Sequence, residues 1–251
     1  MPSRSRFIPI VLLVLFAAAS IRLGIWQLDR LRQRRAANAA ALALREEPEV
    51  RLPAPGGAAR LAGRRVRVVG TYDQGHTIVL RGRALRQVPG VAVVTPLRLE
   101  GPGAGDTAVL VERGFVPAPD AATIPLDTPL DEPGEREVHG LAFPIPSAPD
   151  GGRPITQGGR TTWQRLDLAA LRRLLPYPIL DVYLLQLPDG SLPALPRRLE
   201  PPPLDDGPHL SYAIQWFAFA TIALVFAGVF ARRGGPGGGR RDRWADPAAP
   251  R

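Results

Sequence analysis

The stretch AIQWFAFATIALVFAGVFA, residues 213–231, contains no charged side chain, and its polar members are Gln215 and Thr221. About 20 such residues, at about 1.5 Å of rise each, are enough to cross the hydrocarbon core of a membrane. A core helix of this size is rarely apolar on every face, so the stretch predicts a transmembrane helix. Arginines follow it closely, and the positive-inside rule then places the C-terminus in the cytoplasm.

The apolar segment near the N-terminus has two interpretations. An uninterrupted apolar run covers residues 7–19, which is short for a span, and AAAS at residues 17–20 resembles a signal-peptide cleavage site. The apolar pattern resumes as far as Trp26, however, so residues 7–26 are long enough to span, with Arg22 snorkelling outward. Helical spacing then continues in water. The residues alone favour an uncut helix and leave a cleaved signal peptide open.

Between these two segments, apolar and polar residues alternate with the period of two that is typical of strands. One short helix is predicted at residues 167–175, with Asp167 as its N-cap and Pro176 ending it. The pattern predicts a small antiparallel barrel or sandwich of the α+β class. The predicted strands are 64–72, 77–85, 91–99, 107–116, 137–143 and 179–187.

The predicted architecture is a membrane protein with two transmembrane helices that flank a β-rich extracytoplasmic domain. In chain order, we expect a cytoplasmic N-terminus (1–6), a first transmembrane helix (7–26), a helical extension (27–47), the β-rich domain (48–208), a second transmembrane helix (209–231) and a disordered Arg/Gly-rich cytoplasmic tail (232–251).

The composition of the 251 residues excludes several classes of function. The chain has no Cys, so it has no disulfide framework, no thiolate metal site and no covalent haem attachment through CxxCH. All 32 basic residues are Arg, which together with frequent Gly, Pro and Ala suggests a GC-rich bacterial genome. The positive net charge is compatible with nucleic acid, but many arginines flank the apolar segments at the two ends. That distribution favours a membrane, and no nucleic-acid partner is expected.

Motifs of catalysis are missing as well. His76, His139 and His209 lie far apart in the sequence, and the chain has no HExxH, GxSxG, Walker or dinucleotide-binding motif. A copper carrier would use Cys, Met and His, and the single Met is the first residue. We therefore expect no enzyme and no catalytic residues.

The best candidate for a binding site lies at the start of the second apolar segment. His209 and Trp216 are seven residues apart, which places them about 20° apart around a helix, and Tyr212 lies about 60° away. One face would thus present an imidazole, a phenol and an indole at the outer membrane surface. A neutral imidazole can ligate haem iron, while aromatic rings can pack against the porphyrin. An ordinary interfacial belt of Trp and Tyr explains the same residues, and position alone favours that alternative.

Four blocks of the sequence carry a resemblance to a known family: LGIWQLDRLRQRR (23–35), VLRGRALRQVPGVAVVTPLRL (79–99), AVLVERGFVPAP (108–119) and HLSYAIQWFAFA (209–220). In this order they resemble the surfeit locus protein one family, whose members help to build cytochrome c oxidase. Phe115 stands where the family often has Trp, which keeps an aromatic ring in place. Val91 stands where Tyr is common, so this chain lacks that phenol.

The resemblance implies a topology, a function and a set of partners. In the family the segment before Gly-x-Trp-Gln is kept as a first membrane helix, and two spans surround one extracytoplasmic domain. The expected function is assembly of cytochrome c oxidase, with delivery or insertion of haem a into subunit one. Subunit one and the lipid bilayer are the expected partners, haem a synthase is a further candidate, and haem a is the expected, transiently held cofactor. The expected location is the bacterial cytoplasmic membrane, with both termini in the cytoplasm.

The resemblance also implies roles for particular residues. The family's histidine at the mouth of the second span is implicated in haem handling and corresponds to His209, the candidate ligand of the haem iron, beside Tyr212 and Trp216. By depth, Arg22 and Arg30 are candidates to pair with the haem propionates. The expected partner-binding residues are Trp26, Gln27, Arg113, Gly114 and Phe115.

Three alternatives remain open. One is an enzyme of unknown type that forms a peripheral part of haem a synthesis, although that role would need more intramembrane His than His209. Arg113 and Phe115 are also explained as a structural arginine and a core aromatic residue of the domain. The chain as a whole is also explained as a membrane scaffold that stabilises oxidase assembly intermediates without binding haem.

Overall fold

The computed structural model describes residues 4–53, 60–125, 127–147, 154–157 and 160–233. The chain divides into two compact units, and each is described by itself. A helical unit combines residues 1–38 with residues 205–251, and a β-rich unit comprises residues 39–204. The expected disordered tail lies almost entirely outside the described residues, as does the extreme N-terminus.

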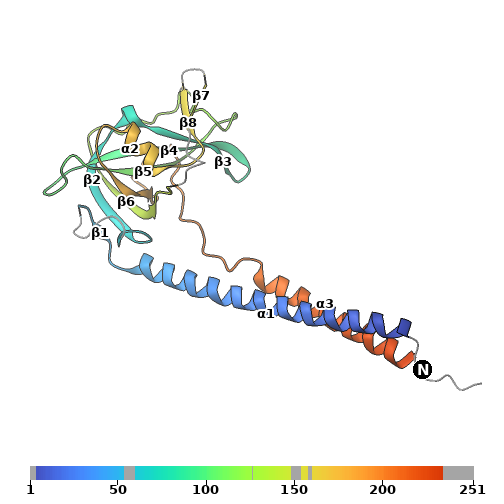
Figure 1. The fold of residues 1–251 in the computed structure, drawn as a ribbon. Coiled ribbons are helices and arrows are strands. Elements are labelled where there is room, and N and C mark those ends of the chain that lie inside the picture. Colours follow the sequence, from blue (N-terminus) through green and yellow to red (C-terminus); the bar gives the residue numbers. More distant parts are fainter. Residues whose placement is uncertain (1–3, 54–59, 126, 148–153, 158–159, 234–251) are drawn as a thin grey trace, which may run out of the picture. The chain divides into compact units, whose positions relative to one another are not determined.

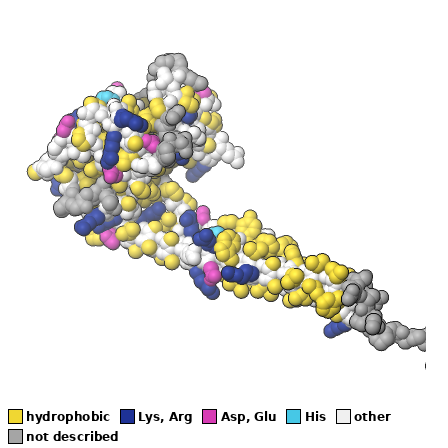
Figure 2. All heavy atoms as spheres, viewed as in Figure 1, with side chains coloured by type: hydrophobic (Ala, Val, Ile, Leu, Met, Phe, Trp, Pro, Cys, Tyr) yellow, Lys and Arg dark blue, Asp and Glu magenta, His cyan; other side chains and the backbone are white. Residues whose placement is uncertain are grey.

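The helical unit is built from two long helices, α1 (Arg4–Glu46) and α3 (His209–Arg233) (Figure 1). The last turns of α1, from residue 39, belong to the β-rich unit. Both helices are long and apolar enough to cross a membrane. Large apolar side chains such as Phe7, Phe16 and Phe226 are exposed along them, and Figure 2 shows apolar groups covering much of their visible surface. Water would penalise that exposure, whereas lipid would not.

The β-rich unit contains every strand that the alternation predicted, with bounds shifted by at most three residues. The sequence did not predict three short strands. The helix predicted at residues 167–175 is confirmed as α2 (Leu168–Leu174). Asp167 is its N-cap, because the Asp167 side chain accepts a hydrogen bond from the backbone N–H of Ala170 at 2.8 Å. The elements are β1 (Val50–Arg51), β2 (Arg65–Tyr72), η2 (Gln74–His76), β3 (Ile78–Leu85), β4 (Val88–Leu99), β5 (Ala108–Pro117), β6 (Glu135–Pro144), β7 (Ile155–Gln157), β8 (Arg160–Trp163), α2 (Leu168–Leu174) and β9 (Ile179–Gln186).

The sheet closes on itself into a small barrel. Its strand order is β1-β2-β6-β9-β5-β4-β3-β8-β7, and β2 also pairs with β4. The strands β2, β6, β9, β5 and β4 therefore form a closed ring. Strands β3, β8 and β7 continue the sheet beyond β4 (Figure 1).

The expected barrel is present and most of its strand pairs are antiparallel, but the sheet also contains parallel pairs. The pairs β1–β2, β3–β8 and β5–β9 are parallel. Alternation identifies a strand but says nothing about the direction of its neighbour, which depends on how the intervening chain crosses over. Between β5 and β9 that chain includes β6 and α2, which bring β9 back in the direction of β5.

The barrel has a core on each side of its central strands. Val66, Val68, Leu97 and other residues fill the interior, while a second cluster on the outer face is covered by Trp163 and the α2 residue Leu171. Strand β2 shows the expected alternation of buried and less buried residues. Strands β4 and β5 are buried almost continuously, because apolar groups cover both of their faces.

Candidate functional site

Small residues let α1 and α3 approach each other closely within the helical unit. Ala17 and Ser20 of α1 and Ala220 and Ala223 of α3 are all buried. A Cβ atom on Gly24 would lie 2.7 Å from the Phe217 ring, so only glycine fits there without movement. Small residues at such an interface are the usual way for membrane helices to pack. This packing fixes the antiparallel register of the two helices.

That register brings together two residues that lie 182 positions apart. The imidazole Nδ1 of His209 lies 2.9 Å from Oε1 of Gln27, within hydrogen-bond distance. His209 is half-buried at the first position of α3, and Gln27 is half-buried on α1. Gln27 was expected to bind a partner, and the sequence did not predict its contact with His209.

A second set of contacts ties the chain just before α3 to α1. Arg34 Nε and Asn38 Nδ2 donate to the backbone carbonyl of Asp205, at 3.2 and 2.8 Å. Arg35 forms an ion pair of 2.8 Å with Asp206. The groups are exposed, so the ion pair contributes little energy by itself. Together with the Gln27–His209 contact, they connect the start of α3 to α1.

Tyr212 and Trp216, which were predicted to share a helix face with His209, differ in exposure and in their neighbours. Tyr212 is exposed, while Trp216 is half-buried and packs edge-to-face against Phe219, with ring centroids 5.8 Å apart. On α1, Trp26 is exposed, and the guanidinium of Arg30 lies 5.6 Å from its ring centroid. The roles of these residues and of the exposed Arg22 in binding haem or a partner stay predictions.

Arg113 lies inside the barrel unit. It is the extra residue of a bulge in β5, because Val93 pairs with Gly114 and Val94 pairs with Glu112. The bulge turns the Arg113 side chain into the interior, where it is fully buried above the Tyr72 ring at 4.8 Å.

Glu132 supplies the counter-charge for two buried arginines. Its Oε1 accepts from Arg113 at 2.7 Å and from Arg198 at 2.5 Å. Burial by itself would raise the pKa of Glu132, but the hydrogen bonds and charges of the two arginines outweigh burial and hold that pKa below its ordinary value. Arg198 is held in turn by Gln186 at 3.1 Å. Glu132 and Arg198 were not among the predicted residues, because they lie in Pro-rich stretches that carry no periodic signal.

Gly114 and Phe115 also have structural roles. Gly114 has a φ of +135°, and a Cβ there would lie 2.2 Å from the backbone oxygen of Arg197. This close approach lets Phe115 and Arg197 exchange two backbone hydrogen bonds, of 2.9 and 2.8 Å. The Phe115 side chain is buried against Gly90. The side chains of Arg113 and Phe115 thus lie in the interior, and a part for them in partner binding stays a prediction.

Comparison with known proteins bears on these features. The profile of the SURF1 family matches residues 14–221, which include most of α1, the first half of α3, the barrel and the buried arginine cluster.

The chain belongs to the SURF1 family.

A SURF1-like protein of Monosiga brevicollis is 29% identical over 249 aligned positions, which cover 87% of this chain and 86% of that protein. The SURF1 family is known generally for cytochrome oxidase assembly factors and is not a family of enzymes. The resemblance drawn from the four sequence blocks is therefore confirmed.

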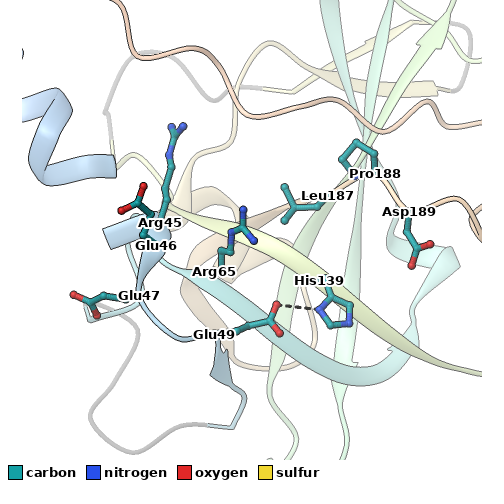
Figure 3. Close-up of a pocket in the computed structure, with 9 residues that line it drawn as sticks. All are labelled: Arg45, Glu46, Glu47, Glu49, Arg65, His139, Leu187, Pro188 and Asp189. Carbon is teal, nitrogen blue, oxygen red and sulfur yellow. Dashed lines mark hydrogen bonds and ion pairs between the residues drawn. The ribbon is translucent and has the colours of Figure 1, made fainter. Parts of the chain in front are cut away.

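The barrel of this SURF1-family chain also has an open cleft of about 740 Å³ (Figure 3). Arg65 and His139 come from β2 and β6, while Glu46 and Glu49 come from the end of α1 and the segment after it. His139 Nδ1 lies 2.9 Å from Glu49 Oε1, and this hydrogen bond, which is drawn as a dashed line in Figure 3, connects that segment to the barrel. The cleft is lined by charges of both signs. No sequence motif indicated it.

A further polar cluster surrounds Asp73, just after β2. Its Oδ2 accepts a hydrogen bond from Tyr177 at 2.6 Å and lies 2.7 Å from His76 Nδ1. Burial would raise the pKa of Asp73, but these hydrogen bonds outweigh it and lower that pKa. Arg98 lies over the Tyr177 ring at 4.3 Å. Within the described part of the chain, no group of three or more His, Cys, Asp or Glu side chains could hold a metal ion.

Replacing Phe115 with Ala is expected to lower the free energy of unfolding of the barrel by about 3 kcal/mol, because it leaves a cavity beside Gly90. The urea dependence of amide hydrogen exchange in β4 and β5 of the full chain measures this change. Phe143→Ala is the matched control and should cost less, since that side chain is only half-buried. Unchanged exchange in Phe115→Ala would contradict the structural role and favour docking.

Proposed function

We propose that this chain is a membrane-anchored assembly factor for cytochrome c oxidase that assists the delivery or insertion of haem a into subunit one. Its membership of the SURF1 family and its two apolar helices support this function. In this proposal the helices cross the cell membrane, the barrel lies outside the cytoplasm and both termini lie inside. The barrel would dock subunit one, and haem a synthase is a candidate donor.

The observation that carries the haem assignment is the environment of His209. Its Nδ1 is engaged by Gln27, and no hydrogen bond to Nε2 comes from the residues that the structure describes. Haem a supplies an iron that accepts a nitrogen ligand, an apolar ring and tail, and two anionic propionates. A single imidazole fits that requirement, whereas a free metal ion would need a larger set of ligands.

The residues around His209 fit the rest of such a ligand. Tyr212 and Trp216, on the same helix, offer aromatic surface to a planar ring, and the exposed apolar side chains of α1 and α3 offer surface to a tail. Arg22 and Arg30 are the candidate partners of the propionates. One protein ligand also suits a protein that must release its cargo, because fewer bonds have to break on transfer.

Replacing His209 with Ala is expected to lower the amount of haem a that copurifies with the full chain by at least about tenfold, as a lost metal ligand or its support typically does. The protein itself should remain inserted and abundant. Absorbance spectra and haem extraction, from cells that make haem a, measure the occupancy. Gln215→Ala is the control, because Gln215 is an exposed residue of the same helix.

Two results would contradict the haem assignment. If His209→Ala keeps full occupancy and an unaltered spectrum, His209 is not the ligand and its aromatic neighbours form an interfacial belt. If the unaltered chain carries no haem a but still associates with the oxidase, the chain is a scaffold for assembly intermediates.

A further inference from the structure

The register of α1 and α3 leaves Gln27 as the residue that meets His209 within the helical unit. Gly24, one turn before Gln27, is pressed against Phe217. Gln27 then reaches His209 with its amide oxygen at 2.9 Å from Nδ1. The contacts of Arg34 and Asn38 with the Asp205 carbonyl restrain the chain just before His209. The meeting of the two side chains is therefore supported by contacts on both sides of it.

A carboxamide oxygen accepts hydrogen bonds and a carboxamide nitrogen donates them, so the Gln27 atom that faces Nδ1 selects the tautomer of a neutral imidazole. In the structure Oε1 is the atom that faces Nδ1, and a hydrogen bond between these two atoms requires the proton on Nδ1 and leaves the lone pair on Nε2. A histidine side chain free in water favours the opposite tautomer, in which Nε2 carries the proton and cannot bind a metal. In metal sites, a protein group that hydrogen-bonds to the ring nitrogen not bound to the metal commonly sets the tautomer and the ring orientation of the histidine ligand.

We propose that Gln27 is a positioning residue, which holds His209 in the Nδ1–H tautomer with Nε2 ready to bind an iron centre. The inference rests on the proposed function for its biological purpose. Its physical content, the tautomer and its cause, is a property of the chain without haem. Gln27 thus acts through His209 rather than by contacting the iron.

The tautomer can be read directly by nitrogen-15 NMR of the haem-free full chain in lipid nanodiscs, labelled in histidine, at a pH where the imidazoles are neutral. The signal that disappears in His209→Ala identifies His209 among the three histidines. We expect the parent chain to carry the proton on Nδ1 as the major form. Nε2–H as the major form in the parent chain would overturn the proposal outright.

Variants of Gln27 test the cause. Gln27→Leu removes the acceptor at similar volume, and we expect Nδ1–H to fall from the major to the minor tautomer. Gln27→Glu restores an acceptor, and we expect Nδ1–H to remain the major form. Gln215→Leu makes the same exchange at an exposed position of α3 and should change nothing. An unchanged tautomer in Gln27→Leu would refute the role of Gln27.

The result is independent of the haem assignment. A parent chain with Nδ1–H, lost in Gln27→Leu and kept in Gln27→Glu, supports positioning by Gln27 even if no haem a is found. The opposite result is also possible to recognise. If the haem-free chain has Nε2–H and still binds haem a through His209, the proposed function is kept and the positioning role of Gln27 is refuted. If Gln27→Leu does not accumulate, Nε2–H as the major form in the parent chain or in Gln27→Glu would still refute the proposal.

Discussion

Glu132→Gln is expected to lower the free energy of unfolding of the barrel unit by about 3–5 kcal/mol. The exchange keeps the shape of the side chain but removes the only carboxylate that contacts Arg113 and Arg198 among the described residues. Both guanidinium groups are buried, so water cannot replace the lost counter-charge. Urea-dependent amide exchange of the barrel strands in the full chain measures the change.

A surface pair provides the control for Glu132→Gln. Glu137 is ion-paired with Arg67, and both side chains are about two-fifths exposed. Glu137→Gln should therefore cost less than about 1 kcal/mol. Equal effects of the two variants would show that the buried cluster contributes no more than an exposed ion pair.

Lowering the pH should remove the stabilisation that the Glu132 carboxylate provides. Because the folded-state pKa of Glu132 lies below its ordinary value of 4.5, its stabilisation is fully present above that value and is lost as the pH falls through the folded-state pKa. The difference in stability between the parent chain and Glu132→Gln should thus shrink as the pH drops below 4.5. A difference that stays constant at lower pH would argue against an ionised Glu132.

Gly114→Ala is expected to lower the free energy of unfolding of the barrel unit by about 4 kcal/mol, because it strains the backbone and breaks hydrogen bonds. The new Cβ would lie 2.2 Å from the Arg197 oxygen, and that oxygen is part of the main chain and cannot rotate away. Separation of the two segments would break the backbone bonds between Phe115 and Arg197. It would also draw Arg198 away from Glu132, so the effects of Gly114→Ala and Glu132→Gln should not be additive.

The control for Gly114→Ala separates strain from collision. Gly134 also has a positive φ, of +80°, but a Cβ there would meet nothing within 4 Å. Gly134→Ala should therefore lower the free energy of unfolding only through backbone strain, by about 1–3 kcal/mol. The melting of both variants in the full chain can be followed by amide exchange in β5. If the two variants lose equal stability, the close approach of Arg197 is not what requires glycine at position 114.

Local patterns in the sequence determined much of this protein. The uncharged run at residues 213–231 is a helix because no break interrupts it, and the alternation in β2 marks a strand with one buried face. Asp167 caps α2 as its position indicated. The four sequence blocks were enough to recognise the family, because their residues and order are read along the chain without a structure. They also singled out Gln27, His209 and Arg113 before any contact between residues was known.

Only the tertiary structure decided which of those residues meet. The Gln27–His209 pair depends on the helix register that Gly24 and Phe217 impose, and the ion pairs of Glu132 depend on a bulge that turns Arg113 inward. The parallel pairing of β5 with β9 likewise depends on the path of the chain between them. The periodicity of a sequence shows which face of a helix or strand is apolar. It does not show which distant residue will pack against that face, because that depends on how the elements fit together in the folded protein.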